Sequence, residues 1–209
     1  MPSLTAVIRD HAPVLVVDTA SLRVQVGLCE ADGRKRWVTR TEEPGAAMFR
    51  GIAELGADLK TIGAFVFCDG PGSVLGIRSA AMAIRVWQTQ RPRPAFAYSS
   101  LALVATALGR AEITVIADAR RDSWHCQQLG GGRFRQATGG LMGELVTPEH
   151  FRCWSIRPAN VATTPYEVAD LWAATATKDL LHATETPDAF LTEEPSFAAW
   201  KARIHRAPA

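Results

Sequence analysis

The sequence lacks the features of several protein classes. No apolar run approaches the roughly 20 residues of a membrane span, and the first residues lack the charged, apolar and small segments of a secretion signal. No Cys-x-x-Cys, His-x-x-x-His or His-Glu-x-x-His spacing occurs, so neighbouring residues do not form a metal site. We therefore expect a cytoplasmic protein without membrane contact or metal.

A strong charge of one sign is also missing. The 209 residues include 23 basic and 21 acidic side chains, a net charge of +2, and the basic ones are scattered. A protein that binds nucleic acid by neutralising its phosphates needs a larger excess of basic residues, so any RNA contact is expected through a partner. Three of the four cysteines, Cys29, Cys68 and Cys126, lie in strand-like runs, which indicates reduced, buried thiols rather than disulfides.

The chain is organised around the stretch from Ala64 to Gln90. An apolar, strand-like run ends at Asp69, a glycine-rich loop follows, and a helical pattern begins near Ile77. Glycines at such a place either let backbone N–H groups surround a phosphate or let a helix pack closely on its sheet. The residues that would form either the phosphate site or the close-packed turn are Gly70, Pro71, Gly72, Ser73, Gly76 and Arg78.

Two named phosphate motifs are excluded at this loop. A Walker loop needs Gly-Lys-Ser/Thr, and no lysine lies between Thr61 and Tyr98. The dinucleotide fingerprint needs a glycine where Leu75 stands and an acidic residue where Ser99 and Ser100 stand. A close-packed turn and a phosphate site of another kind both stay open.

The remaining pattern predicts alternating strands and helices, and therefore an α/β fold. Strands are expected at Val14 to Asp18, Arg23 to Cys29, Arg34 to Arg40, Ala64 to Cys68, Ala95 to Tyr98, Ile113 to Asp118, 124–126 and 133–135. Helices are expected at 46–60, 77–90, 101–108, 164–181 and briefly after Thr147. Residues 1–12 are expected to form a loose leader or a short turn, and the tail from Thr184 to form coil with a short final turn.

The strand pattern repeats at an offset of one hundred residues. Val14-Leu-Val-Val-Asp18 falls on Thr114-Val-Ile-Ala-Asp118, and in both places an alternating strand, a glycine-bearing turn and a basic strand follow. This spacing favours two similar halves, residues 1–109 and 110–209, over a solenoid with its shorter repeat. No low-complexity linker separates the halves, so we expect one continuous body.

Carboxylates stand at the ends of three apolar strands, at Asp18, Asp69 and Asp118. Ligands gather at the carboxyl ends of strands in α/β sheets, where such groups can hold a metal-nucleotide. The simpler alternative is that each aspartate caps the turn that follows it. The segment Asp118-Ala-Arg-Arg121 also has three possible interpretations: a phosphate site, a contact with an acidic partner, or a solvated ion pair. The possible cleft residues are Asp18, Thr19, Asp69, Ser99, Asp118 and Arg120.

The expected helix 77–90 is apolar on most of its sides, although a sheet covers only one. The expected helix 46–60 likewise has apolar residues around much of its circumference. The pair is therefore expected to meet another pair of helices, from a second copy or another subunit, unless both are buried in a larger core. The expected partner interface consists of Met48, Phe49, Ile52, Leu55, Met82, Arg85 and Val86.

Four segments together resemble the TsaB (YeaZ) family. They are Val14-Leu-Val-Val-Asp18-Thr19, Gly70-Pro-Gly-Ser73 with Gly76-Ile-Arg78, Tyr98-Ser-Ser-Leu101, and Ile116-Ala-Asp-Ala-Arg-Arg121. The resemblance implies the actin/Hsp70/acetate kinase superfold with two RNase H-like halves. It also implies a non-catalytic partner of the TsaD subunit in making threonylcarbamoyladenosine beside the tRNA anticodon, with TsaE as the ATPase. In that family the helices flanking the loop bind TsaD, or a second TsaB when TsaD is absent, and tRNA is reached through the complex.

The chain departs from the family pattern in three places. Val74 and Leu75 replace a Phe and a Thr of the loop, Gly45-Ala46 replaces a His-Ser pair, and Phe190-Leu191-Thr192 replaces a Tyr-Leu-Arg signature. The loss of the loop hydroxyl argues against a nucleotide site. We therefore expect a scaffold subunit with no catalytic residue and no cofactor. The alternative is a small nucleotide-dependent kinase or hydrolase that binds ATP or ADP between Asp18 and Asp118.

Overall fold

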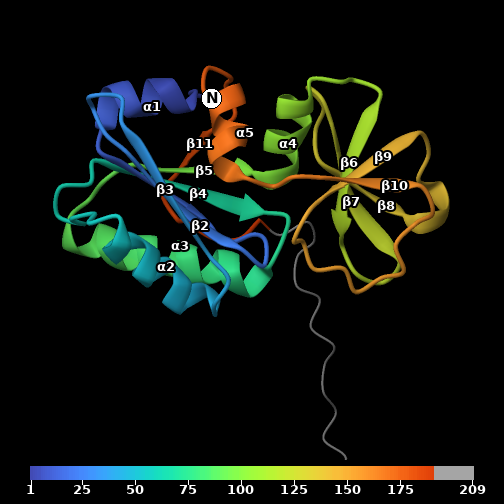
Figure 1. Cartoon of the computed structure of the whole chain (residues 1–209), viewed down its shortest axis with the longest axis horizontal. Helices are drawn as coiled ribbons and strands as arrows, with labels where there is room; N and C mark the ends of the chain where they lie inside the picture. The colour runs from blue at the N-terminus through green and yellow to red at the C-terminus, as the bar shows by residue number, and fades with distance from the viewer. Residues whose placement is uncertain (191–209) are drawn as a thin grey trace, which may run out of the picture.

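The computed structural model describes residues 1–190, which form two mixed β-sheets and five α-helices (Figure 1). The helices are α1 (Leu4–His11), α2 (Pro44–Glu54), α3 (Val74–Gln90), α4 (Ser100–Leu108) and α5 (Val168–Thr175). The strands are β1 (Val14–Asp18), β2 (Val24–Cys29), β3 (Lys35–Arg40), β4 (Ala64–Gly70), β5 (Ala95–Ser99), β6 (Ile113–Asp118), β7 (Ser123–Gln128), β8 (Phe134–Ala137), β9 (Glu144–Pro148), β10 (Val161–Thr164) and β11 (His182–Thr184). A short 3₁₀ turn, η1, spans Thr138–Gly140.

The five strands of the second sheet have the same order as five of the six strands of the first. The first sheet runs β11-β5-β4-β1-β2-β3, and the second runs β10-β9-β6-β7-β8. In the first, β1, β2 and β3 are antiparallel, whereas β4 and β5 run parallel to β1. In the second, β6, β7 and β8 are antiparallel, whereas β9 and β10 run parallel to β6. The expected correspondence of Val14–Asp18 with 114–118 thus places both segments at the same position in their sheets.

Helices cover both faces of the first sheet (Figure 1). Leu15 and Val17 of β1 face α2 and α3, whereas Val14 and Val16 face α1 and α5. Both faces are therefore dry, which explains why β1 is an uninterrupted apolar run. Helix α4 packs between the two sheets, and one cluster of buried side chains extends from the first sheet into β6 and β9. The chain forms one body, as its lack of a linker predicts.

Serine caps start the two helices at the centre of the fold. The hydroxyl of Ser73 accepts a hydrogen bond from Gly76 at the start of α3, and that of Ser99 accepts one from Ala102 at the start of α4. Helix α4 ends at Gly109 in the left-handed conformation, with φ +65°. The boundaries predicted for α4 are confirmed, and α3 begins three residues earlier than its apolar pattern indicates.

Several predicted elements are wrong. Residues 4–11 are a helix rather than a leader, because Leu4 and Val7 are buried in the core. Thr147-Pro148 lies in β9 rather than at a helix start, since its pairing with Thr163 and Thr164 of β10 outweighs a local capping signal. Thr164 likewise ends β10, and α5 covers only part of the expected 164–181. Helix α2 is shorter than 46–60 and ends before Gly56, whose φ is +61°.

The C-terminal part of the described chain returns to the first sheet. Strand β11 pairs antiparallel with β5, although coil is expected from Thr184, the last residue of this strand. The expected division at 109/110 places β11 in the second half, whereas its hydrogen bonds are with the first sheet. Leu191 and Thr192 of the altered family signature, and the short final turn, lie outside the described residues.

The cysteines and the helices have two further properties that bear on the predictions. Cys29, Cys68 and Cys126 are buried free thiols, as predicted, and Cys153 is a free thiol at the surface. Within residues 1–190, the helices are too short or too polar to cross a membrane.

Candidate functional site

The glycine loop is pressed against the turn that follows β1. A Cβ on Gly72 would lie 2.4 Å from the carbonyl oxygen of Ala20, and a Cβ on Gly76 would lie 2.4 Å from that of Thr19. The N–H of Ser73 donates to the same Ala20 carbonyl at 2.7 Å. These glycines therefore permit close packing of α3 on the first sheet, which favours the turn alternative over a phosphate cradle.

The other loop residues support this packing. The carbonyl of Pro71 accepts a hydrogen bond of 2.6 Å from the Ser100 hydroxyl at the start of α4. Gly70 has φ +121°, a conformation that favours glycine. Arg78 is exposed, and its guanidinium lies 3.8 Å from the Asp188 carboxylate. The loop thus joins α3, α4 and the C-terminal segment.

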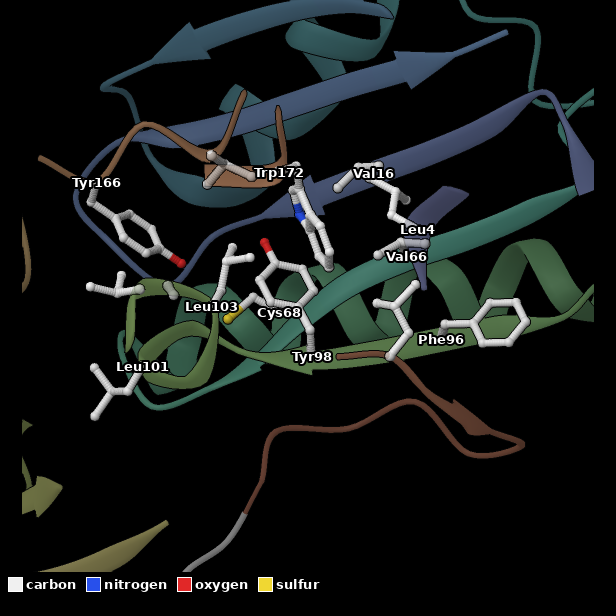
Figure 2. Packing of buried hydrophobic residues seen from close by; sticks show 14 of the residues in the cluster. Leu4, Val16, Val66, Cys68, Phe96, Tyr98, Leu101, Leu103, Tyr166 and Trp172 are labelled. Atoms are coloured by element: carbon white, nitrogen blue, oxygen red, sulfur yellow. The ribbon is translucent and has the colours of Figure 1, made fainter. Parts of the chain in front are cut away.

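Asp18 is fully buried beneath the loop. One carboxylate oxygen accepts hydrogen bonds from the hydroxyls of Tyr98 and Tyr166, at 2.6 and 2.7 Å, and the other accepts one from the Ala20 N–H at 3.0 Å. Burial raises the pKa of Asp18, and the hydrogen bonds from the tyrosines oppose that rise. Figure 2 shows both tyrosines in the same packed cluster. Neighbouring Thr19 is buried too, and its hydroxyl has no hydrogen-bond partner among the described residues.

Asp69 contacts groups from two distant segments. Its carboxylate lies 4.0 Å from the guanidinium of Arg133, in the turn before β8, and 3.3 Å from Nε2 of His182 in β11. The Arg133 guanidinium also stacks over the ring of Phe190 at 3.5 Å. Burial lowers the pKa of Arg133, and the Asp69 charge opposes that change. Sequence reasoning missed Arg133, although the basic strand repeated in both halves contains it.

Asp118 ties two loops of the second half together. Its carboxylate accepts hydrogen bonds from the backbone N–H groups of Arg120, Trp154 and Ser155, and from the Ser155 hydroxyl. Burial alone would raise the pKa of Asp118, but these hydrogen bonds outweigh it, and the pKa is lowered. Asp118 forms no ion pair with Arg120 or Arg121 among the described contacts, so the simple ion-pair alternative is wrong.

The expected cleft residues do not converge on one site. A cavity of about 210 Å³ brings the loop residues Gly72 and Ser73 to Asp118 and Arg120. Asp18 and Thr19 lie in the core instead, and Asp69 lines a separate cavity of about 40 Å³. Ser99 caps α4 and lines neither cavity.

The expected partner interface divides into buried and exposed parts. Met48, Ile52 and Leu55 are buried under α2 in the chain's own core, so they are not surface residues of this chain. Their spacing of three and four residues places them on the helix side that faces the sheet. Phe49, by contrast, is 52% exposed, as are Met82 and Val86 of α3. We call Phe49, Met82, Arg85 and Val86, all exposed, the α2–α3 face.

Comparison with known proteins bears on the fold. No protein-family model and no curated protein matches the sequence. A solved structure of YeaZ from Pseudomonas aeruginosa superposes with a TM-score of 0.58 at 21% identity, covering 77% of this chain and 89% of that one. The chain has the YeaZ fold. A second structure, of an uncharacterized protein with similarity to peptidase YeaZ from Pseudomonas aeruginosa, gives a TM-score of 0.57 at 22% identity over 77% of this chain and 88% of that one.

The YeaZ fold is of the actin-like type, so the superfold expected from the sequence is confirmed at that level. At this identity the likeness to YeaZ establishes the architecture alone.

Proposed function

We propose that the chain is a TsaB-type scaffold subunit that binds a TsaD-type subunit through the α2–α3 face. The observation that carries the proposal is the exposure of Phe49, Met82 and Val86 on two adjacent helices of a YeaZ fold. In this proposal the complex makes threonylcarbamoyladenosine in tRNA, a TsaE-type subunit supplies the ATPase, and the isolated chain forms a homodimer through the same face.

The α2–α3 face has the composition of a docking surface. Met82 and Val86 are one helical turn apart on α3, and the Phe49 ring on α2 meets the edge of Trp87 at a centroid distance of 6.1 Å. The backbone that carries these three side chains is already helical, so binding a partner needs to order only their rotamers. Each half-exposed side chain contributes about 1 kcal/mol when it is covered. Arg85 beside them supplies a charged edge that selects the partner.

The same proposal includes a duplicated architecture. The second sheet repeats the strand order and strand directions of the first, with β6 in the place of β1. We infer that the two sheets are RNase H-like halves. The second half is the shorter one, because a loop at 149–160 stands where the first sheet has α3 between its parallel strands.

The hydrogen bonds of the two candidate carboxylates support a subunit without catalytic activity. A kinase or hydrolase of this superfold would need Asp18 and Asp118 on one nucleotide, yet Asp18 accepts three hydrogen bonds within the core. Asp118 lines the cavity beside the glycine loop, but its carboxylate oxygens accept hydrogen bonds from the backbone N–H groups of Arg120 and Ser155. Within residues 1–190, no group of three His, Cys, Asp or Glu side chains is placed to bind a metal ion. Calorimetry with ATP and Mg²⁺ is expected to show no stoichiometric site, and a tight site with turnover would favour the enzyme.

Co-purification with the TsaD protein of the same genome tests the scaffold role. We expect a complex at micromolar concentration, and we expect Met82→Glu combined with Val86→Glu to abolish it, because two carboxylates would be buried without partners. Met142→Glu combined with Phe134→Glu is the matched control, since both residues are exposed on the second half. A complex that survives the α2–α3 substitutions, or never forms, would contradict the proposal. Mass in solution without TsaD tests the homodimer in the same way.

A further inference from the structure

A cavity of about 330 Å³ on the second half is not used by the proposed function. It is lined by Arg120, Arg121 and Asp122 from the β6–β7 loop and by Trp154 and Ser155 from the β9–β10 loop. Trp154 is 67% exposed, and the Arg120 guanidinium lies 5.6 Å from the centre of its ring. Two cations, one carboxylate and an exposed aromatic ring thus share one hollow.

The backbone of this hollow is held in an uncommon conformation. Arg120, Arg121 and Asp122 have φ values of +64°, +52° and +51°, the left-handed region that residues with side chains seldom occupy three times in succession. Hydrogen bonds around the loop maintain it. The Ser123 hydroxyl donates to the Arg120 carbonyl at 2.6 Å, and the Thr138 N–H donates to the Asp122 carbonyl at 2.9 Å. The arginine side chains therefore project from a fixed base.

Asp118 fixes the aromatic side of the hollow as well. The same carboxylate that accepts the Arg120 N–H also accepts the N–H groups of Trp154 and Ser155. It is therefore a positioning residue, because it sets the distance between the two loops without lining the cavity. Such preorganisation reduces the cost of ordering the site on binding.

The charges of the hollow are available to a ligand. Neither Arg120 nor Arg121 has a carboxylate partner among the described ion pairs, and both are exposed. The β9–β10 loop adds two further exposed arginines, Arg152 and Arg157, beside Trp154. An aromatic platform flanked by unpaired arginines is the arrangement on which unpaired bases stack while phosphates meet cations.

We propose that Trp154, Arg120 and Arg121 bind an unpaired nucleotide of a single-stranded RNA, with the base on the Trp154 ring and the flanking phosphates on the arginines. A strand fits better than a free nucleotide because Arg152 and Arg157 lie outside the cavity, where neighbouring phosphates would pass. A protein partner fits less well, because among the described residues that line the cavity Trp154 is the one large apolar side chain. The small net charge of the whole chain is compatible with this site, since stacking supplies affinity that phosphate neutralisation alone would not.

Fluorescence anisotropy of the full chain with a labelled 12-nucleotide oligouridine tests the site. At 50 mM salt we expect a Kd of about 10–100 μM. Trp154→Ala is expected to weaken binding about tenfold and Trp154→Phe less than about threefold, because phenylalanine keeps a stacking surface. Arg120→Ala with Arg121→Ala is expected to reduce the slope of log K against log salt by about 1.4, the value for two phosphates. Lys60→Ala with Lys178→Ala, two exposed lysines elsewhere, is the charge-matched control and is expected to keep the slope.

Several results would overturn this inference. They are no binding by the unsubstituted chain, equal losses in the Trp154→Ala and Trp154→Phe variants, or the same loss of slope in the lysine control. Displacement of the strand by UMP at equal nucleotide concentration would assign a mononucleotide site instead. Duplex RNA that binds as tightly, without dependence on Trp154, would also contradict the proposal.

The RNA site and the α2–α3 face can fail separately. The RNA measurement uses the chain alone, and Met82→Glu with Val86→Glu is expected to leave it unchanged. Trp154→Ala is in turn expected to leave the complex with TsaD intact. Each proposal therefore keeps its own test.

Discussion

The carboxylate of Asp18 and the phenol hydroxyl of Tyr166 lie 2.7 Å apart, although 148 residues separate them in the sequence. The Tyr98 hydroxyl meets the same carboxylate oxygen at 2.6 Å. One buried oxygen thus joins β1, β5 and the segment that returns from the second sheet before α5. Asp18, which the sequence marks as a possible cleft residue, is a buried hydrogen-bond acceptor in the core.

Tyr166→Phe tests this role, because it removes the hydroxyl but keeps the ring, which packs edge-on against Phe151 at 4.8 Å. Removing one partner of a buried hydrogen bond costs about 1–3 kcal/mol, so we expect the free energy of unfolding to fall by about 2 kcal/mol. Urea denaturation at pH 7 measures the change. Tyr98→Phe is expected to have a similar effect, and a loss below about 0.5 kcal/mol in both variants would contradict a stabilising pair of bonds.

The pH dependence of stability should differ in sign between Asp18 and Asp118. Burial raises the pKa of Asp18, so the folded state holds its proton more tightly than the unfolded state. This contribution to stability is full below about pH 4, the unfolded pKa, and is lost as the pH rises through the folded pKa. The pKa of Asp118 is lowered by its hydrogen bonds, so its contribution is present above about pH 4 and lost as the pH falls.

Asp18→Asn and Asp118→Asn make this difference measurable. The unfolding free energy of the unsubstituted chain minus that of the Asp18→Asn variant is expected to decrease as the pH rises above about 4. The corresponding difference for Asp118→Asn is expected to increase between about pH 2.5 and 5. Two differences that change in the same direction would show that the environments of the two carboxylates are wrongly assigned.

Gly76→Ala tests the close contact of α3 with the turn after β1. Alanine in a helix is ordinarily about 1 kcal/mol more favourable than glycine. Here its Cβ would lie 2.4 Å from the Thr19 carbonyl oxygen, and relieving that clash costs about 3 kcal/mol. We expect a net loss of about 2 kcal/mol in thermal or urea unfolding. Gly132→Ala, which has open space around it, is the control and is expected to change stability by less than about 0.5 kcal/mol.

The thiols provide a test of burial. Cys153 is exposed, whereas burial raises the pKa of both Cys29 and Cys126 to about 11 and makes them poor nucleophiles. We expect a disulfide reagent to modify one thiol per folded chain and all four after denaturation. Cys153→Ser should abolish the native reaction. Rapid modification of a second thiol would show that the core opens more readily than its packing indicates.

Local pattern was sufficient for the elements at the centre of the fold. The apolar run of β1, the alternation of β2 and the extent of α4 follow from neighbouring residues, so the sequence predicts them. The sequence also lacks the lysine and the loop hydroxyl that a phosphate site at the glycine loop would use, and the structure favours close packing there. The helix start expected at Thr147-Pro148 is wrong because the capping signal is local, whereas the pairing of these residues depends on β10, a strand that lies beyond the following loop.

The sequence by itself determined the α/β class, the repeated strand order and the apolar breadth of helices α2 and α3. Only the tertiary structure decided which side of α2 is exposed, which groups surround Asp18 and Asp69, and that Trp154 lies beside Arg120. The physical reason is the same in each case. These contacts join side chains tens to more than one hundred residues apart, and their energies depend on burial and on partners that no local pattern specifies.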